Sequence, residues 1–274
     1  MNKSEAIKGY EALLETKLDG TTRGGKNFAL PSLTFPNQNP DLKEAWSEGD
    51  DPYDPEQNAP PTLDLSTYPK NGNQWPSSPQ GFREIMYQYN DAMLAFSKKL
   101  MRTIALALDL EETYFDHMAD FPMSGLRALH YPSQEVANDV GIGAHADYSW
   151  FTLVNQLSPT PGLEVLNHNG EWVSAPPIAN TLVCNVGDFL EMATNGDFVS
   201  TVHRVVNKTG EERYSIPYFF SPSKDVMIET LPTCVKEGEG VMQPIVAGDW
   251  QRERLLRARY KHPSSVAARA KGEI

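Results

Sequence analysis

Cysteine is scarce in this sequence. Of its 274 residues only Cys184 and Cys234 are cysteine, and two thiols supply neither a disulfide framework nor a zinc ribbon. Cys184 lies in the short apolar run TLVCNV, where we expect a buried structural thiol because free cysteine is among the most buried residue types. The sequence therefore gives no indication of a cysteine-based scaffold.

Long apolar runs are also absent. Nowhere do about eighteen apolar residues follow one another, the length that a membrane-spanning helix needs. The opening residues, MNKSEAIKGYEALLETK, contain no apolar core of the kind found in a signal peptide. We therefore expect a cytoplasmic protein.

Positive charge is in the minority. The sequence has 24 basic and 36 acidic residues, a formal net charge of -12, and no stripe of Lys and Arg interleaved with aromatic residues. This composition disfavours nucleic acid and anionic membranes as partners. A small-molecule substrate is the partner that we expect, while the oligomeric state is not readable from the sequence.

The pattern of the chain predicts one structural domain in four segments. Residues 1–77 are rich in Pro, Gly, Asn and Asp and are expected to be ordered loop with one or two short helical turns, packed on the core. Residues 78–124 are expected to be helical support, with Ser78 as N-cap of a long amphipathic helix and a shorter helix over 111–116. Residues 125–231 form the core, and residues 232–274 a helical tail capped by Asp249.

The core segment has the texture of a β protein. From Gly125 onward, short β-like runs alternate with turn signals, and Asn169-Gly170 is the strongest hairpin signal among them. About eight short strands at this spacing favour a jelly roll or a sandwich over a parallel sheet. The predicted fold class is therefore mainly β, with flanking α-helices.

Two residues of the core stand out as metal ligands. His145 and Asp147 lie in the run GIGAHADYSW, and side chains at positions i and i+2 of a strand point to the same face. His203, in the later run TVHRVV, can join them from a distant strand of a rolled sheet. Two imidazoles and one carboxylate form the protein part of a non-haem ferrous site with open positions, although several metals fit this pattern.

The other four histidines have plainer interpretations. A core position with a satisfied hydrogen bond is expected for His130, and surface positions are expected for His117, His168 and His262. His145 taken alone would also be a weak candidate, and the pairing with Asp147 is what makes it a strong one.

A possible anion clamp follows the third candidate ligand. Arg213 and Ser215, in the run ERYSIPYFF, are again at positions i and i+2 of a predicted strand. A guanidinium beside a hydroxyl suits bidentate binding of a carboxylate. The plainer alternative is an arginine at a strand edge in a surface ion pair.

Taken together, these motifs resemble the isopenicillin N synthase-like branch of the Fe(II)- and 2-oxoglutarate-dependent oxygenases. The resemblance rests on the order of a series of motifs along nearly the whole chain: Asp41-Leu42-Lys43-Glu44, Asn73-Gln74-Trp75-Pro76, His145-Ala146-Asp147, Phe151-Thr152-Leu153, Gly162-Leu163-Glu164-Val165, Asn185-Val186-Gly187-Asp188, Thr194-Asn195-Gly196, His203-Arg204-Val205 and Arg213-Tyr214-Ser215-Ile216-Pro217. It implies a double-stranded β-helix, the jelly roll of this family. Its cofactors would be Fe(II), 2-oxoglutarate as co-substrate, and O2.

The resemblance also assigns roles to residues. It implies that His145, Asp147 and His203 bind the iron, and that Arg213, Ser215 and Tyr131 hold the distal carboxylate of 2-oxoglutarate. Two positions depart from the family, because Leu129 replaces an asparagine and Ala146 a hydroxyl residue. The substrate pocket is less defined, and its candidate walls are Trp150, Phe219 and Phe220.

The expected function is an oxygenase that hydroxylates or desaturates a small organic metabolite and releases succinate and CO2. Two alternatives remain open, namely an iron oxidase of the same family that does not use 2-oxoglutarate, and a truncated binding module without catalysis. The second arises because family members usually begin with a further strand and helix ahead of the first residue here. If that segment is absent, an edge of the jelly roll is expected to be uncovered.

Overall fold

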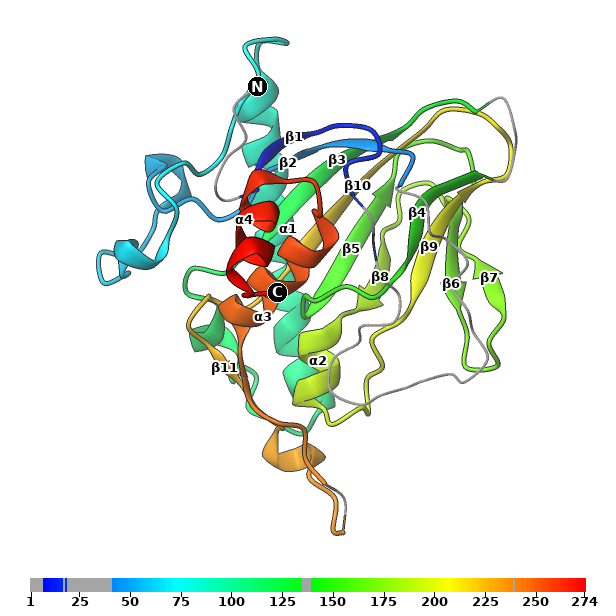
Figure 1. Ribbon diagram of the computed structural model, residues 1–274. Coiled ribbons are helices and arrows are strands. Elements are labelled where there is room, and N and C mark those ends of the chain that lie inside the picture. The colour runs from blue at the N-terminus through cyan, green and yellow to red at the C-terminus, as the bar shows by residue number, and fades with distance from the viewer. Residues whose placement is uncertain (1–6, 17, 19–40, 135–138, 239) are drawn as a thin grey trace.

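Two antiparallel sheets form the centre of the protein (Figure 1). The computed structural model describes residues 7–16, 18, 41–134, 139–238 and 240–274. The six-stranded sheet has the order β1-β2-β3-β10-β5-β8, and the four-stranded sheet has the order β4-β9-β6-β7. A two-stranded ribbon, β11-β12, lies apart from both. The predicted mainly β jelly roll is confirmed.

The strands are short, as their sequence spacing predicts. Their bounds are β1 Gly9–Glu11, β2 Glu44–Ser47, β3 Gly125–Tyr131, β4 Asp139–His145, β5 Phe151–Gln156, β6 Leu163–Leu166, β7 Trp172–Ser174, β8 Val183–Val186, β9 His203–Asn207, β10 Arg213–Phe220, β11 Met227–Ile228 and β12 Ile245–Val246. The β6–β7 hairpin turns at Asn169-Gly170 as predicted, with Gly170 at a φ of 80°. This left-handed conformation favours glycine because it has no Cβ.

Four α-helices accompany the sheets in the described part of the chain: α1 Phe82–Ala107, α2 Asp188–Ala193, α3 Ala247–Ala258 and α4 Pro263–Lys271. Short 3-10 helices occur at Pro55–Gln57, Leu65–Thr67, Asp116–Ala119 and Pro232–Cys234. The predicted helix over 111–116 is therefore only a turn that leads into a 3-10 helix. Among the described residues, no helix has both the length and the apolar character needed to cross a membrane.

Helix α1 packs on the outer face of the six-stranded sheet. Its buried residues Met86, Met93 and Met101 share one apolar cluster with Leu126 of β3 and Tyr218 of β10. This contact explains the helical recurrence of apolar residues in the sequence.

Two predicted helix caps are wrong. The N-cap of α1 is Gly81, whose φ of 81° ends the preceding turn, and so Ser78 lies outside the helix. Helix α3 begins earlier than predicted, with Val246 as N-cap, and Asp249 lies within its first turn. An acidic side chain there still interacts favourably with the helix dipole.

The N-terminal segment contributes more than the predicted loops. Strand β2 pairs with β3, and β1 pairs with β2, so that these strands extend the six-stranded sheet at its β3 edge. Short strands of three and four residues carry too little alternation to be recognised from sequence. The division into segments 1–77, 78–124, 125–231 and 232–274 stays a proposal, and much of the first segment lies outside the described residues.

The surface differs from the prediction at two residues. Cys184 is exposed, while Cys234 is buried. Strand β8 is an edge strand, and Asn185, the next residue along it, points instead toward Asp147. His262, predicted to be at the surface, is 3% exposed and caps α4 by accepting a hydrogen bond from the Ser264 amide.

One buried carboxyl group predicts a pH-dependent stability. Burial raises the pKa of Glu48 to about 8, against the opposing effect of Lys8, and neither carboxyl oxygen has a hydrogen-bond partner among the described residues. Between the unfolded value of 4.5 and the folded value the unfolded state releases the proton, so stability falls as the pH rises.

Glu48→Gln is therefore expected to raise the free energy of unfolding by roughly 2–4 kcal/mol near pH 8, and by little near pH 4.5. The measurement is urea unfolding at both pH values, with the exposed Glu229→Gln as the matched control. An equal effect of Glu48→Gln at both pH values would contradict the prediction.

Candidate metal centre

The three predicted ligands come together at one end of the two sheets. His145 ends β4 and His203 begins β9, and the two residues face each other directly in the antiparallel pairing of these strands. Their ring centroids are 4.3 Å apart. One ligand atom from each of His145, Asp147 and His203 lies within 4.8 Å of the others. No other cluster of three or more His, Cys, Asp or Glu side chains in the described part of the chain has the geometry to hold a metal ion.

Asp147 reaches the cluster by a route other than the predicted one. It lies beyond the last residue of β4, so the expected i, i+2 geometry within one strand does not apply. The turn is fixed instead by its backbone: the Asp147 carbonyl accepts a hydrogen bond from the Asp188 amide at 2.7 Å, and Arg254 donates to the Ala146 carbonyl at 3.2 Å. Ala146 is buried in an apolar cluster with Ala144, Leu166 and Val202.

The electrostatics of the cluster suit a cation. Burial and the neighbouring His203 lower the pKa of His145 to about 3, which leaves the imidazole neutral and its Nε2 lone pair available. Burial alone would raise the pKa of Asp147, but His203 and His145, together with hydrogen bonds from Thr152 and Asn185, hold it below its usual value. Neutral imidazoles and an ionised carboxylate are the forms that bind a divalent metal.

Both histidines are oriented by backbone carbonyls. His145 Nδ1 lies 2.8 Å from the Gly143 carbonyl oxygen, and His203 Nδ1 lies 3.0 Å from that of Thr201. A carbonyl can only accept, so each Nδ1 carries the hydrogen and Nε2 is left as the ligand atom.

Thr152 and Asn185 orient the carboxylate, and the sequence motifs that contain them gave no hint of this role. Thr152 Oγ1 and Asn185 Nδ2 donate to Oδ2 of Asp147 at 2.6 and 2.8 Å. The two residues are directly paired across β5 and β8. With Oδ2 engaged twice, Oδ1 is the oxygen left for a metal.

Removing one of these donors is expected to weaken metal binding. In Asn185→Ala, Asp147 keeps only the Thr152 bond and becomes free to rotate, so affinity for Fe(II) or the probe Co(II) should fall by roughly 10–100-fold. Anaerobic equilibrium dialysis measures this directly. Asn169→Ala, at an exposed turn residue, is the matched control, and unchanged affinity in Asn185→Ala would contradict the role.

A second group of predicted residues lies next to the cluster. Arg213 and Ser215 are buried on the same face of β10, and Tyr131 of β3 is paired with Arg213 in register. Arg213 Nη1 donates to Ser215 Oγ at 3.3 Å and Nη2 to Gln156 Oε1 at 3.0 Å, while its carbon Cζ lies 5.0 Å from the Tyr131 ring centre. Gln156 is a further residue that the sequence did not single out.

The surroundings of Arg213 fit an anionic ligand. The residue is 3% exposed, and its recorded partners Ser215, Gln156 and Tyr131 are all neutral. Within the described residues its Nε has no hydrogen-bond partner. A buried guanidinium without a carboxylate is costly, and a bound carboxylate would supply the missing charge and acceptor.

One cavity of about 50 Å³ joins the two groups. We call it the inner cavity, and its lining includes the metal cluster, the clamp and Phe219: Leu18, Arg127, Leu129, Tyr131, Ile142, His145, Asp147, Thr152, Val154, Leu163, His203, Val205, Arg213, Ser215, Pro217 and Phe219. Leu129, where the family has asparagine, adds an apolar wall.

Two predicted pocket walls lie elsewhere. Trp150 is 1% exposed and packs against Phe115 and Phe189, and Phe220 is 1% exposed and packs against Phe151. Neither residue lines the cavities beside the metal cluster. Trp150 and Phe220 are therefore core residues, and of the three predicted pocket walls Phe219 lines both cavities. His130 is also not in the core, since it is half-buried in a surface contact with Glu44 and stacks on Tyr214.

Comparison with known proteins identifies the family. The family model of the 2OG-Fe(II) oxygenase superfamily matches residues 122–222. A 2-oxoglutarate-Fe(II) type oxidoreductase of Aspergillus fumigatus is 35% identical over 84% of this chain and 69% of its own length. Others are an Emericella nidulans 2-oxoglutarate-Fe(II) type oxidoreductase, 38% identical over 74% of this chain, and an Arabidopsis thaliana homoarginine-6-hydroxylase, 38% identical over 65%. The chain spans 59% and 55% of the lengths of these last two relatives.

Solved structures agree with the sequence relatives. A full-length Neurospora crassa protein in complex with alpha-ketoglutarate and thymine has a TM-score of 0.71 and 30% identity, over 93% of this chain and 75% of that chain. A 2OG-Fe(II) oxygenase family protein from Caulobacter crescentus has a TM-score of 0.70 and 31% identity, over 90% of this chain and 75% of that chain.

Proposed function

This chain belongs to the 2OG-Fe(II) oxygenase superfamily, and from that premise we propose that it is an Fe(II)- and 2-oxoglutarate-dependent oxygenase. It hydroxylates or desaturates a small organic metabolite and releases succinate and CO2. The observation that carries the proposal is the inner cavity, in which the His145–Asp147–His203 cluster and the Arg213 clamp line one space. Within the superfamily, the ordered series of motifs supports the isopenicillin N synthase-like branch.

The residues present fit both Fe(II) and 2-oxoglutarate. His145 Nε2, His203 Nε2 and Asp147 Oδ1 would hold the iron, and this donor set is typical of non-haem ferrous sites. Arg213 and Ser215, with Tyr131 beside them, would hold the distal carboxylate of 2-oxoglutarate. The bound iron, 2-oxoglutarate and O2 together supply the oxidising power.

The protein's own part is to bind, orient and exclude water. Arg213 fixes one end of the co-substrate, so that its other end is directed at the cluster along the inner cavity. The apolar walls Leu129, Leu163 and Phe219 keep that space dry. Thr152 and Asn185 keep Asp147 in position, and Phe219 would also contact the substrate.

The co-substrate distinguishes this function from its two alternatives. Of the structural neighbours, the Neurospora crassa protein was solved with alpha-ketoglutarate, which supports use of the same compound here. A 2-oxoglutarate-independent oxidase would also place an arginine and a serine on this strand, but its clamp would receive no co-substrate. A non-catalytic binding module would not need oriented metal ligands.

Two measurements test the proposal. Anaerobic titration of the protein with Fe(II) and 2-oxoglutarate is expected to give a ferrous 2-oxo-acid charge-transfer band, which reports simultaneous binding of both. A turnover screen over small metabolites is expected to give succinate in proportion to O2 consumed. Oxidation of a metabolite without succinate would favour the oxidase alternative, and the absence of any band would favour the binding module.

A further inference from the structure

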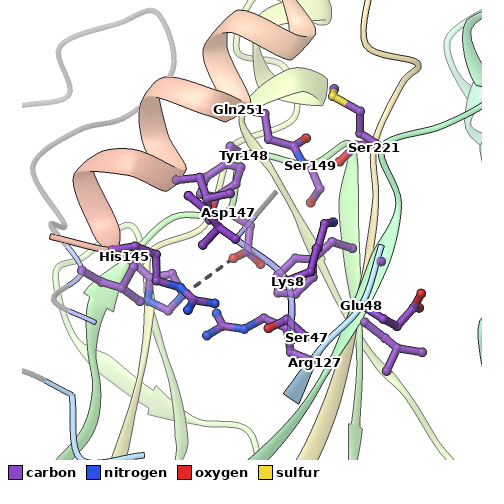
Figure 2. A pocket seen from close by; sticks show the side chains of 18 residues that line it. Lys8, Ser47, Glu48, Arg127, His145, Asp147, Tyr148, Ser149, Ser221 and Gln251 are labelled. Carbon is purple, nitrogen blue, oxygen red and sulfur yellow. Dashed lines mark ion pairs between the residues drawn. The ribbon is translucent and has the colours of Figure 1, made fainter. Parts of the chain in front are cut away.

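A second cavity of about 100 Å³ opens beside the metal cluster (Figure 2). We call it the outer cavity. It shares Leu18, His145, Asp147, Arg127 and Phe219 with the inner cavity. Most of its exposed surface is apolar, and Ile7, Met123, Leu126 and Leu255 are among the apolar side chains that line it. A substrate in the outer cavity therefore lies against the metal ligands and has an apolar body.

Three cationic side chains from different elements also line the outer cavity. Arg127 comes from β3, Arg259 directly follows α3, and Lys8 precedes β1. In Figure 2 the Arg127 side chain extends from its strand toward His145. Of the arginine and lysine residues in the described part of the chain, only Arg127 lines both cavities.

Among the described residues, the carboxylates around Arg127 are fewer than the basic side chains that pair with them. Glu11, fully buried, pairs with Lys43, Arg127 and Arg259, and Glu15 lies 3.8 Å from Arg259. Within the described residues, three basic side chains thus share two carboxylates, and burial raises the pKa of Asp41, a further acid near Arg127, to about 7. Burial and the charge of Arg127 lower the pKa of Arg259 to about 9, and the same two causes lower that of Lys43.

Nearby acids do not remove this surplus. Lys8 pairs with Asp50 at 3.5 Å, which neutralises only Lys8. Glu48 lines the cavity, but burial raises its pKa to about 8, so it is largely uncharged at neutral pH. Its carboxyl group points away from His145 in Figure 2. A bound anion next to Arg127 would meet the surplus charge, since Arg127 Nε lacks a hydrogen-bond partner within the described chain.

We propose that the substrate is an organic acid, with an apolar body in the outer cavity and a carboxylate paired with Arg127. This inference rests on the proposed function, because it concerns the substrate of that same metal site. The carboxylate anchors one end of the substrate, and a carbon some bonds away is presented to His145 and Asp147. Arg127 is then the specificity-determining residue, distinct from Arg213, which serves the co-substrate.

The test compares acids with their own amides. Isothermal titration of the anaerobic Fe(II)- and 2-oxoglutarate-loaded protein uses a panel of aryl and alkyl monocarboxylic acids and the primary amides with the same carbon skeletons. We expect at least one acid to bind roughly tenfold or more tightly than its amide, as for a charge-assisted hydrogen bond. In Arg127→Gln that preference should disappear, and in Arg127→Lys part of it should remain.

Controls separate this inference from the proposed function. The exposed Arg102→Gln, which removes a surface pair with Asp116, should keep the preference of the wild type. If Arg127→Gln does not fold, Arg127→Met replaces it, because methionine keeps an apolar stem in the cavity and leaves Glu11 paired with Lys43 and Arg259.

The outcomes are distinct. No acid preferred over its amide in the wild type, or a preference kept in Arg127→Gln, overturns the proposal. So does a loss of 2-oxoglutarate affinity in Arg127→Gln, which would assign Arg127 to the co-substrate. The charge-transfer band, recorded on the same sample before any acid is added, tests the proposed function separately.

Discussion

His145→Ala is expected to abolish both the charge-transfer band and succinate formation. The variant removes one of two imidazoles that face each other across β4 and β9, with ring centroids 4.3 Å apart. Asp147 and His203 alone offer two ligand atoms, which is too few to hold Fe(II) against water in an open site. We expect affinity for Fe(II) to fall by at least about a hundredfold, which exceeds the effect of losing a supporting hydrogen bond.

The result is read by metal binding as well as by activity. Equilibrium dialysis with Co(II) under anaerobic conditions gives the affinity without turnover, and thermal unfolding of the metal-free protein shows whether the fold is kept. His117→Ala, at an exposed residue of a 3-10 helix, is the matched control. If His145→Ala binds Fe(II) as the wild type does, the cluster is not the metal site.

The sequence pattern predicted these ligands, but the structure supports only part of the argument that led to them. The alternation of a strand suggested that His145 and Asp147 share a face, yet Asp147 lies outside β4 and is positioned by hydrogen bonds of its backbone and its neighbours. The residues that do this come from β5, β8, α2 and α3. Such long-range contacts leave no periodic trace in the sequence.

Local sequence patterns predicted the strands and turns better than they predicted whether a side chain lies in the core, in a cavity or at the surface. The hairpin at Asn169-Gly170 depends on local backbone conformation and was predicted correctly. Cys184, Trp150 and Phe220 were predicted in the wrong environment, because an apolar strand does not reveal which face meets the core and which meets a cavity or solvent. Arg127 was missed for the same reason, since a single arginine in a strand resembles a surface residue until the second sheet is placed over it.

Arg213→Met is expected to weaken 2-oxoglutarate binding by roughly a hundredfold, while the affinity for Fe(II) alone stays near that of the wild type. Arg213 is buried, and its recorded partners in the described chain are all neutral. A bound carboxylate would therefore supply its counter-charge. Two charge-assisted hydrogen bonds are lost at once in Arg213→Met. Arg213→Lys keeps the charge but not the planar fork, and an intermediate loss is expected.

The measurement is the 2-oxoglutarate concentration that gives half of the charge-transfer band, together with KM for 2-oxoglutarate once a substrate is known. Arg102→Met, which removes an exposed arginine, serves as the control. Ser215→Ala should raise the half-saturating concentration only several-fold, because one neutral hydrogen bond is worth about 1 kcal/mol. A full band at wild-type concentrations in Arg213→Met would mean that the co-substrate carboxylate binds elsewhere, and Arg127, on the wall between the two cavities, would then be the residue to examine.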